Sequence, residues 1–323
     1  MHVMRNRPGD QRAGQRANPV LTIGNFDGMH RGHDALISRC RDLAARGSEV
    51  AVVTFEPLPQ ALFWPDSAPA RLSTVYQKLQ LLRDKGVDRV WLLRFDRAFS
   101  RLSARDFAEQ VIVRGLAASH VVVGEDFHFG HRREGDVEKL SGFGRQHGFE
   151  LDIVPAVYQH GARVSSSAIR HFLAQGDFPA AAAMLGRPFS MEGHVVRGQH
   201  LGRKLGYPTA NLRIRAVPSP VEGIFAVHAR TCGQDEHASW MPGVCSLGWR
   251  PTVGGREPLL EVHIFEFDGD LYGQRLEVEF VAKLRKESHF ATIEQLVEQM
   301  RHDEAQARAI LARSPQAPAI TAH

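Results

Sequence analysis

The first half of the chain alternates short apolar runs with segments in which apolar residues recur at helical spacing. The helical pattern occupies residues 33–47, 73–86 and 103–116. The apolar runs around these segments are typical of buried strands and span residues 19–24, 49–56, 88–95, 118–127 and 150–157. Strands that alternate with helices predict an α/β fold with a doubly wound, Rossmann-like parallel sheet. In such a sheet, ligands bind beyond the carboxyl ends of the strands.

The pattern changes near residue 186. Residues 165–189 predict two helices and a linker, and the runs that follow are separated by turns alone: 193–198, 223–232, 239–248, 259–267 and 274–284. Strands without helices between them predict an antiparallel barrel or sandwich. An amphipathic segment at 292–313 predicts a closing helix. We therefore expect a flexible arm at 1–18, a first domain at 19–185, a second domain at 186–312 and a disordered tail at 313–323.

The formal charge of +4 is concentrated at the N-terminus, where Arg5, Arg7, Arg12 and Arg16 against Asp10 give +3. A basic arm can bind nucleic acid, but a solvated arm is the simpler interpretation. The remaining charge of about +1 provides no broad basic face, so we expect no nucleic-acid partner. No apolar run reaches the roughly eighteen residues of a membrane span, and the N-terminus lacks the apolar core of a secretory signal. We expect a cytoplasmic protein that is a monomer or a weak homo-oligomer.

The cysteines Cys40, Cys232 and Cys245 are far apart in the sequence and odd in number. No CxxC motif occurs, which argues against a disulfide framework and against a cysteine zinc site. Reduced, buried thiols are the expected state.

The segment GNFDGMHRGH at residues 24–33 follows the first predicted strand. It is neither a Walker loop nor a GxGxxG loop. Its glycines permit a tight turn, and the helix after it presents free N–H groups to an anion. His30 and His33 share one face of the helix start and can donate hydrogen bonds to phosphate oxygens. The residues of this loop expected to contact phosphate are Gly24, Asn25, Phe26, Asp27 and Gly28.

Other interpretations of this segment are a glycine turn with two surface histidines, or a zinc site for which no third ligand is evident. Asp27 is a candidate contact for the incoming substrate or a metal. The HxGH pair resembles the signature of the adenylyltransferase superfamily related to class I aminoacyl-tRNA synthetases. A second signature of that superfamily resembles VSSSAIR at residues 164–170. There Ser165, Ser166 and Ser167 can cap a helix that binds phosphate, and Arg170 supplies a forked cation.

Two further segments lie after predicted strands, on the ligand side of the sheet. FEPLP at 55–59 contains Pro57 and Pro59, and VVVGEDFHFG at 121–130 contains Phe127 and Phe129. The aromatic pair can stack on a flat ring, although such pairs more often lie in a core. With the HxGH segment, these motifs resemble the bacterial bifunctional riboflavin kinase/FAD synthetase family. The resemblance implies that both segments form the flavin side of an adenylylation site and that Asp126 contacts the flavin.

GQHLGRKLGYPTANL at residues 198–212 is the most specific stretch of the second half. In a strand, Thr209 and Asn211 point to the same side. Their oxygens suit a hard cation that carries ATP phosphates, although the same letters also fit a simple turn at a strand start. Gly202, Lys204 and Gly206 are the expected phosphate contacts of the loop before them.

The segment LLEVHIFEF alternates apolar and polar residues. Leu260 and Val262 take one face of the strand, and Glu261 and His263 take the other. Glu261 is a candidate general base for an alcohol, or else a solvent-facing glutamate.

These segments, with PVEGIFAV and GVCSLGWRPTVGG, resemble a riboflavin kinase module, which folds as a small barrel with a helical appendage. The resemblance spans residues 19–312. It implies that Thr209 and Asn211 serve Mg-ATP, that Glu261 deprotonates the ribityl hydroxyl of riboflavin, and that magnesium (Mg2+) serves both sites. The implied reactions convert riboflavin to FMN and FMN to FAD, each with ATP.

The chain departs from the family pattern at Phe225, where the family has tyrosine, and at Cys245 and Ser246, where it has alanine and asparagine. The first is a mild change, and the second alters polarity in a way that could affect flavin affinity. Two rival hypotheses are an adenylyltransferase with a degenerate barrel and a noncatalytic flavin-binding regulator that uses its basic arm on RNA. The presence of Thr209, Asn211 and Glu261 argues against the first rival, and the two adenylylation signatures argue against the second.

Overall fold

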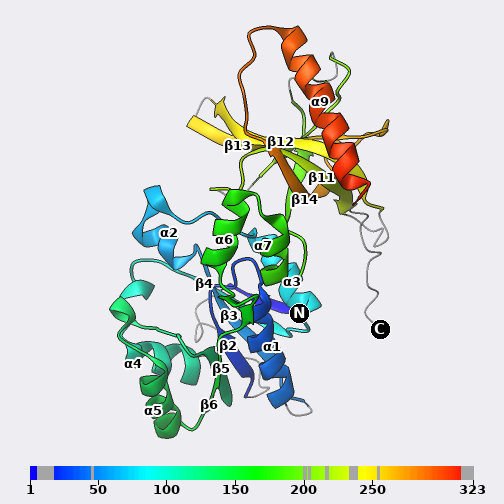
Figure 1. Ribbon diagram of the computed structural model, residues 1–323. Helices are drawn as coiled ribbons and strands as arrows, with labels where there is room; N and C mark the ends of the chain where they lie inside the picture. The colour runs from blue at the N-terminus through cyan, green and yellow to red at the C-terminus, as the bar shows by residue number, and fades with distance from the viewer. Residues whose placement is uncertain are drawn as a thin grey trace. The chain divides into compact units, whose positions relative to one another are not determined.

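The computed structural model describes residues 1–5, 18–44, 47–198, 202, 205–214, 218–232, 239–252 and 255–313. The chain forms two compact units (Figure 1). Unit 1 comprises Met1–Pro69 and Val75–Ser166, and unit 2 comprises Ala70–Thr74 and Ser167–His323. Within the described residues, no helix is long and apolar enough to cross a membrane.

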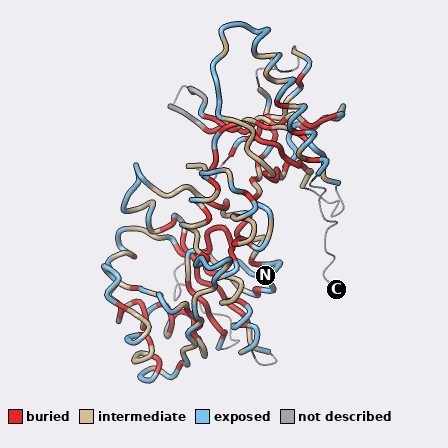
Figure 2. Tube along the Cα trace, viewed as in Figure 1, coloured by how far each residue is buried: buried red, intermediate tan, exposed pale blue. Residues whose placement is uncertain are grey.

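Unit 1 is built on a six-stranded parallel sheet with the strand order β1-β4-β3-β2-β5-β6, which confirms the predicted α/β fold. Its central strands are buried along their length (Figure 2). The strands are β1 His2–Met4, β2 Val20–Ile23, β3 Val50–Glu56, β4 Arg89–Arg94, β5 His120–Gly124 and β6 Glu150–Val154.

Helices cover both faces of this sheet, so it is doubly wound. Val52 of β3 packs in a core with Ile37 and Leu82, whereas its neighbour Val53 packs in a separate core with Phe107. This division follows from the alternation of side chains along a strand. The helices are α1 Arg31–Leu43, α2 Pro59–Phe63, α3 Val75–Asp84, α4 Ala104–Phe107, which continues as a π-helical segment Ala108–Val113, and α5 Val137–His147.

The N-terminus differs from the flexible arm expected at residues 1–18. His2–Met4 form β1 and pair in parallel with β4, so that Val3 lies beside Val90. Without β1, the outer side of β4 would present unpaired backbone groups, which can form hydrogen bonds with any segment that reaches them. A strand of three residues is too short to show a periodic pattern, so the sequence pattern could not predict it. Residues 6–17 of the expected arm lie outside the described residues.

β6 also differs from the expectation, because it is not a buried strand. It is the last strand of the sheet and pairs only with β5 among the described strands. Ile153, the fourth of its five residues, is 49% exposed. The apolar run at residues 150–157 is thus an edge strand with one open side.

Unit 2 contains a closed antiparallel barrel with the order β10-β13-β12-β11-β14-β9, which decides between the barrel and the sandwich. Its strands are β9 Ser190–Val196, β10 Ala210–Arg213, β11 Gly223–Cys232, β12 Met241–Thr252, β13 Gly255–Ile264 and β14 Arg275–Arg285. Two helices precede it, α6 Ser166–Gln175 and α7 Phe178–Leu185, and α9 Ile293–Leu311 follows it. The predicted helices at 165–189 and 292–313 are therefore confirmed.

Helix α9 attaches to the barrel through a small apolar core and one buried ion pair. Ala307 and Leu311 of α9 pack against Ala226 and Phe265. Asp303, which is 4% exposed, accepts hydrogen bonds from Arg285 Nε (2.9 Å to Oδ1) and Nη2 (2.7 Å to Oδ2). This bidentate geometry is the strong form of an arginine–carboxylate pair.

We predict that Asp303→Ala lowers the free energy of unfolding of unit 2 by about 3–5 kcal/mol, because it leaves the Arg285 guanidinium without its buried partner. Urea unfolding followed by circular dichroism measures the change. The control is Glu266→Ala, which removes an ion pair with Arg308. The side chain of Glu266 is 83% exposed. Exposed pairs contribute about 1 kcal/mol or less, so equal losses from the two variants would contradict the assignment.

Candidate active sites

The predicted phosphate loop lies at the point where the order in which the chain adds strands to the sheet reverses. From β2 the chain proceeds to β3 and β4 on one side and then returns to β5 on the other. The carboxyl end of β2 is therefore the topological switch point, where open α/β sheets bind their ligands. Residues 24–30, which join β2 to α1, occupy this position.

Two side chains of this loop pack in the core and stabilise its conformation. Phe26 (φ 48°) and Met29 (φ 46°) adopt the left-handed conformation that side chains disfavour, and both are almost completely buried. Their packing in the core that α1 and α3 cover offsets the conformational cost. Phe26 was among the predicted phosphate contacts, but the whole residue is 0% exposed and it does not belong to the lining of the cavity described below. Asp27 is 2% exposed.

His30 and His33 cap α1 reciprocally. Nδ1 of His30 accepts the N–H of His33, and Nδ1 of His33 accepts the N–H of His30, both at 3.3 Å. The two rings stack with centroids 3.6 Å apart and 13° between their planes. A nitrogen that accepts a hydrogen bond cannot carry a proton, so the ring hydrogen of each neutral histidine lies on Nε2. The cap thus selects the tautomer in which Nε2–H is a donor.

Glycine at residue 32 suits this stack, because a Cβ at that position would lie 3.2 Å from both Nδ1 and Cε1 of His30, which is tighter than most Cβ contacts. The serine-rich segment reaches the same loop. Ser166 Oγ donates to the carbonyl oxygen of Asp27 at 3.0 Å. The structure therefore brings together the two segments that the sequence separates by more than 130 residues. Ser167 and Arg170 belong to unit 2, where the Arg170 guanidinium donates to the carbonyl oxygen of Ala70.

A cavity of about 1150 Å³ opens at this end of the sheet. The predicted residues that line it are Gly24, Asn25, His30, His33, Pro59, Asp126, Phe127, Phe129, Ser165 and Ser166. Its volume is slightly above the range of about 300–1000 Å³ that is usual for ligand pockets. One part of the lining is the histidine-capped loop, and another part is aromatic.

The aromatic part contains residues that the sequence interpretation missed. Phe63 and Trp64, at the end of α2, line the cavity and are 54% and 57% exposed. Phe129, by contrast, is 6% exposed and packs against Phe107, so it is chiefly a core residue. Phe127 stacks on it at 5.5 Å. The signal for the missed pair was the sequence QALFW directly after FEPLP, where the two rings lie at the end of a helix that begins at Pro59.

Three arginines, Arg132, Arg133 and Arg163, contribute positive charge to the lining of the cavity, which also contains the carboxylates of Glu125 and Asp126. Arg163 forms an ion pair with Asp126 at 2.7 Å, and the Asp126 side chain is 65% exposed. Asp126, the residue predicted to contact the flavin, is therefore paired with the guanidinium group of Arg163 at the cavity.

In unit 2, strand register gathers the candidate kinase residues. Asn211 of β10 and Ser246 of β12 both lie directly opposite Glu261 of β13. Leu260 and Val262, on either side of Glu261, are buried in the barrel. Since side chains alternate along a strand, the carboxylate of Glu261 lies on the other face, with the side chains of its two opposite partners.

The loop before β10 closes over Asn211. A Cβ at Gly198 would lie 2.4 Å from Asn211 Nδ2, and one at Gly202 would lie 2.3 Å from the Tyr207 carbonyl oxygen and 3.4 Å from Thr209 Oγ1. These glycines allow the backbone to approach both candidate magnesium ligands. Gly206 has φ +84°, a conformation that favours glycine. Lys204 lies outside the described residues.

Comparison with known proteins gives matches over both units. The FAD synthetase family matches residues 13–168, and the riboflavin kinase family matches residues 185–311. A bifunctional riboflavin kinase/FMN adenylyltransferase of Escherichia coli K12 is 42% identical over 290 residues, which cover 90% of this chain and 91% of that protein. The protein of the same description from Pseudomonas fluorescens is 45% identical over 297 residues, which cover 91% and 94%.

Among solved structures, a Streptococcus pneumoniae protein described as a macrolide-efflux protein has a TM-score of 0.81 and 29% identity. The match covers 95% of this chain and 99% of that one, so the two share their fold along their whole length.

A further group of ionisable side chains lies on strands β9, β11 and β14 of the barrel. The ligand atoms of Glu192, Cys232 and Glu277 lie within 4.8 Å of one another. Arg275 pairs with Glu192, and Arg230 pairs with Glu277, so the carboxylates already have cationic partners. Burial, reinforced by Glu277, raises the pKa of Glu192 from 4.5 to about 7. Burial also raises the pKa of the Cys232 thiol to about 12.

We predict that Glu192→Gln makes unfolding less dependent on pH. A carboxyl with a raised pKa holds its proton more tightly in the folded state, so its contribution is present below pH 4.5 and is lost as the pH rises to about 7. Above that pH the variant should gain about 2 kcal/mol relative to the native chain, allowing for partial solvent screening. Urea unfolding between pH 4.5 and 8 measures the difference. A gap that stays constant over this range would contradict the assignment.

Proposed function

The chain belongs to the family of bifunctional riboflavin kinase/FMN adenylyltransferases, and we propose that it converts riboflavin to FMN in unit 2 and FMN to FAD in unit 1. Each step consumes ATP. The observation that carries the proposal is that the chain contains both candidate sites, each assembled from segments that are distant in sequence. The histidine cap meets the serine segment in unit 1, and Asn211, Glu261 and Ser246 meet in the barrel.

For adenylyl transfer, a phosphate oxygen of FMN attacks the α-phosphorus of ATP, and the bond to the departing pyrophosphate breaks. The Nε2–H groups of His30 and His33 can donate to the phosphate oxygens on which negative charge develops. The N-terminus of α1 adds its N–H groups and its positive end. Ser165, Ser166, Ser167 and Arg170 are the proposed contacts of the triphosphate. No covalent intermediate with the protein is required.

The cavity in unit 1 has separate surfaces for the two ends of FMN. Its aromatic part, with the exposed rings of Phe63 and Trp64, suits the flat isoalloxazine ring. Pro57, Pro59, Asp126, Phe127 and Phe129 remain the proposed flavin-side residues from the sequence. Arg132, Arg133 and Arg163 in the lining provide charge complementary to phosphates.

For phosphoryl transfer, the Glu261 carboxylate accepts the proton of the ribityl 5′-hydroxyl as its oxygen attacks the γ-phosphorus of ATP, and ADP departs. Mg2+ would neutralise charge on the phosphates in both sites. The oxygen atoms of Thr209 and Asn211 are donors that this hard cation accepts, and they are proposed to hold it in unit 2. Gly202, Lys204 and Gly206 are the proposed phosphate contacts of the preceding loop.

We also propose that the protein works in the cytoplasm. Its three cysteines are free, and two of them are buried. Reduced thiols are typical of that compartment.

We predict that the two activities separate by mutation. The double substitution of His30 and His33 by alanine should reduce FAD formation by about 100-fold or more, because the transition-state donors are lost, while FMN accumulates from riboflavin. Glu261→Gln should reduce FMN formation by a similar factor, because the general base is lost, while supplied FMN still becomes FAD. Chromatography of reactions with riboflavin or FMN, ATP and magnesium measures both products.

The controls are His302→Ala and Glu298→Gln, which change exposed residues of α9. Both should leave each activity within about two-fold of the native chain. If either site variant stayed folded but lost both activities, the assignment of one reaction to each unit would be wrong.

A further inference from the structure

Helix α3 of unit 1 carries a lysine in a position that belongs to the core. Lys78 is 0% exposed and is one of the largest fully buried side chains of the described residues. Leu82, one helical turn later, is also 0% exposed and packs in the core beneath the phosphate loop. The two residues share the face of α3 that meets the sheet. A leucine at residue 78 would suit this packing. A buried ammonium group, by contrast, costs free energy unless it is hydrogen-bonded or paired with an opposite charge.

The ammonium group of Lys78 is directed at one carbonyl group of the phosphate loop. Lys78 Nζ donates to the Asn25 carbonyl oxygen at 2.8 Å and to Thr54 Oγ1 at 3.3 Å. Thr54 Oγ1 in turn donates to the same Asn25 oxygen at 3.0 Å. Thr54 lies near the end of β3 and is also 0% exposed. Two buried side chains from separate elements therefore converge on a single backbone oxygen.

This oxygen controls the orientation of the loop at its first turn. The carbonyl of Asn25 and the N–H of Phe26 belong to one planar trans peptide group and point in opposite directions. With the carbonyl fixed toward Lys78 and Thr54, the N–H of Phe26 points away from them. Phe26, the residue after Asn25, has a positive φ (48°). Gly28 (φ 83°) and Met29 (φ 46°) follow with positive φ angles as well. A peptide free to rotate here would alter the path of the chain into His30.

We propose that Lys78 is a positioning residue for adenylyl transfer, which acts by fixing the Asn25–Phe26 peptide so that the loop presents its N–H groups and His30 to the ATP phosphates. Thr54 assists it. The loop is then fixed at three places: at Asn25 by Lys78 and Thr54, at Asp27 by Ser166, and at His30 by His33. Lys78 does not touch substrate in this role. The inference rests on the proposed FMN adenylyltransferase activity.

The test is steady-state kinetics of FAD formation by Lys78→Met, which keeps the length of the side chain and removes the ammonium group. Misplacement of a phosphate loop by about 1 Å can cost roughly 100-fold in rate, so kcat should fall by about 10- to 100-fold. The KM for FMN should stay within about two-fold, because the aromatic part of the cavity is unchanged. Riboflavin kinase activity of the same variant reports on the integrity of unit 2.

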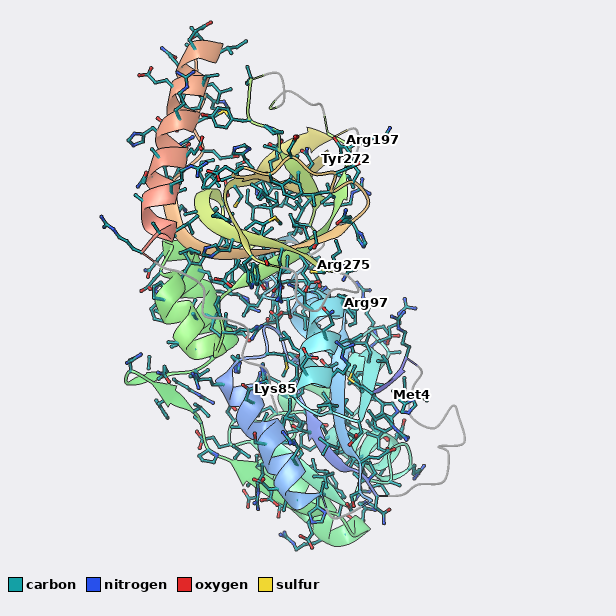
Figure 3. All side chains as sticks on the ribbon, turned by 90° about the vertical axis from the view of Figure 1, so that its right-hand side faces the viewer. Met4, Lys85, Arg97, Arg197, Tyr272 and Arg275 are labelled. Atoms are coloured by element: carbon teal, nitrogen blue, oxygen red, sulfur yellow. The ribbon has the colours of Figure 1, made fainter. Side chains whose placement is uncertain are left out.

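The matched control is Lys85→Met, near the end of the same helix. Lys85, labelled in Figure 3, forms an exposed ion pair with Asp34 of α1 at 2.9 Å. This variant removes a lysine and an ion pair close to α3 without touching Asn25. It should keep kcat for FAD formation within about two-fold of the native chain.

A second pair of variants tests the proposal without a change of charge. Thr54→Val removes the hydroxyl that donates to Asn25 and should lower kcat severalfold, whereas Thr54→Ser keeps the hydroxyl and should restore it. A merely structural role would make valine, which has nearly the shape of threonine, at least as good as serine. This pair decides the matter even if Lys78→Met does not fold.

The proposal is overturned if folded Lys78→Met retains kcat within about three-fold, if its loss lies in the KM for FMN instead, or if Thr54→Val and Thr54→Ser behave alike. If the native chain itself made no FAD from FMN and ATP, the proposed function would fail first. The two failures are therefore distinguishable.

Discussion

The reciprocal cap between His30 and His33 is the interaction on which the geometry of unit 1 depends. One pair of side chains begins α1, closes the glycine loop, and fixes the tautomer of both rings. Each ring uses its Nδ1 to accept a backbone hydrogen bond, so in the neutral form the donor of each ring is Nε2–H. Helix capping thus uses one edge of each imidazole, and the proposed phosphate contact uses the other. A Cβ at position 32 would lie close against the ring of His30, so glycine is favoured there.

In unit 2, closure of the barrel fixes the positions of the candidate site residues. Glu261 is opposite Asn211 on one side and Ser246 on the other only in the observed register. A shift of one residue would turn the carboxylate into the interior and expose Leu260 or Val262. The apolar interior therefore fixes the register, and the register assembles the candidate kinase site. In unit 2, the candidate side chains are therefore positioned by packing that the hydrophobic pattern already requires.

The sequence predicted those parts of the fold that rest on periodicity. The alternation of strands and helices and the later run of strands were sufficient for the sheet and the antiparallel unit. Periodicity could not distinguish the edge strand β6 from a buried one, and it overlooked α5. That helix was marked by its ends, since Asp136 caps it and Gly148 (φ 82°) terminates it. The motifs located both candidate sites, but they could not show that Phe26 is buried or that Phe63 and Trp64 line the cavity. Lys78 was missed because a lysine counts as polar in any periodicity, even where it takes the place of a core residue.

The departure at Phe225 has a physical account in the structure. Phe225 is 0% exposed and lies between Phe178 and Phe280, with ring centroids 5.9 and 5.1 Å away. A buried tyrosine needs a partner for its hydroxyl, whereas phenylalanine packs among these rings without one. Phe225 thus belongs to the apolar interior of unit 2. The change at residue 246 is of another kind, since Ser246 lies opposite Glu261. A short hydroxyl there leaves more room beside the proposed general base than an asparagine would, so of the two departures it is the one placed to influence the kinase reaction.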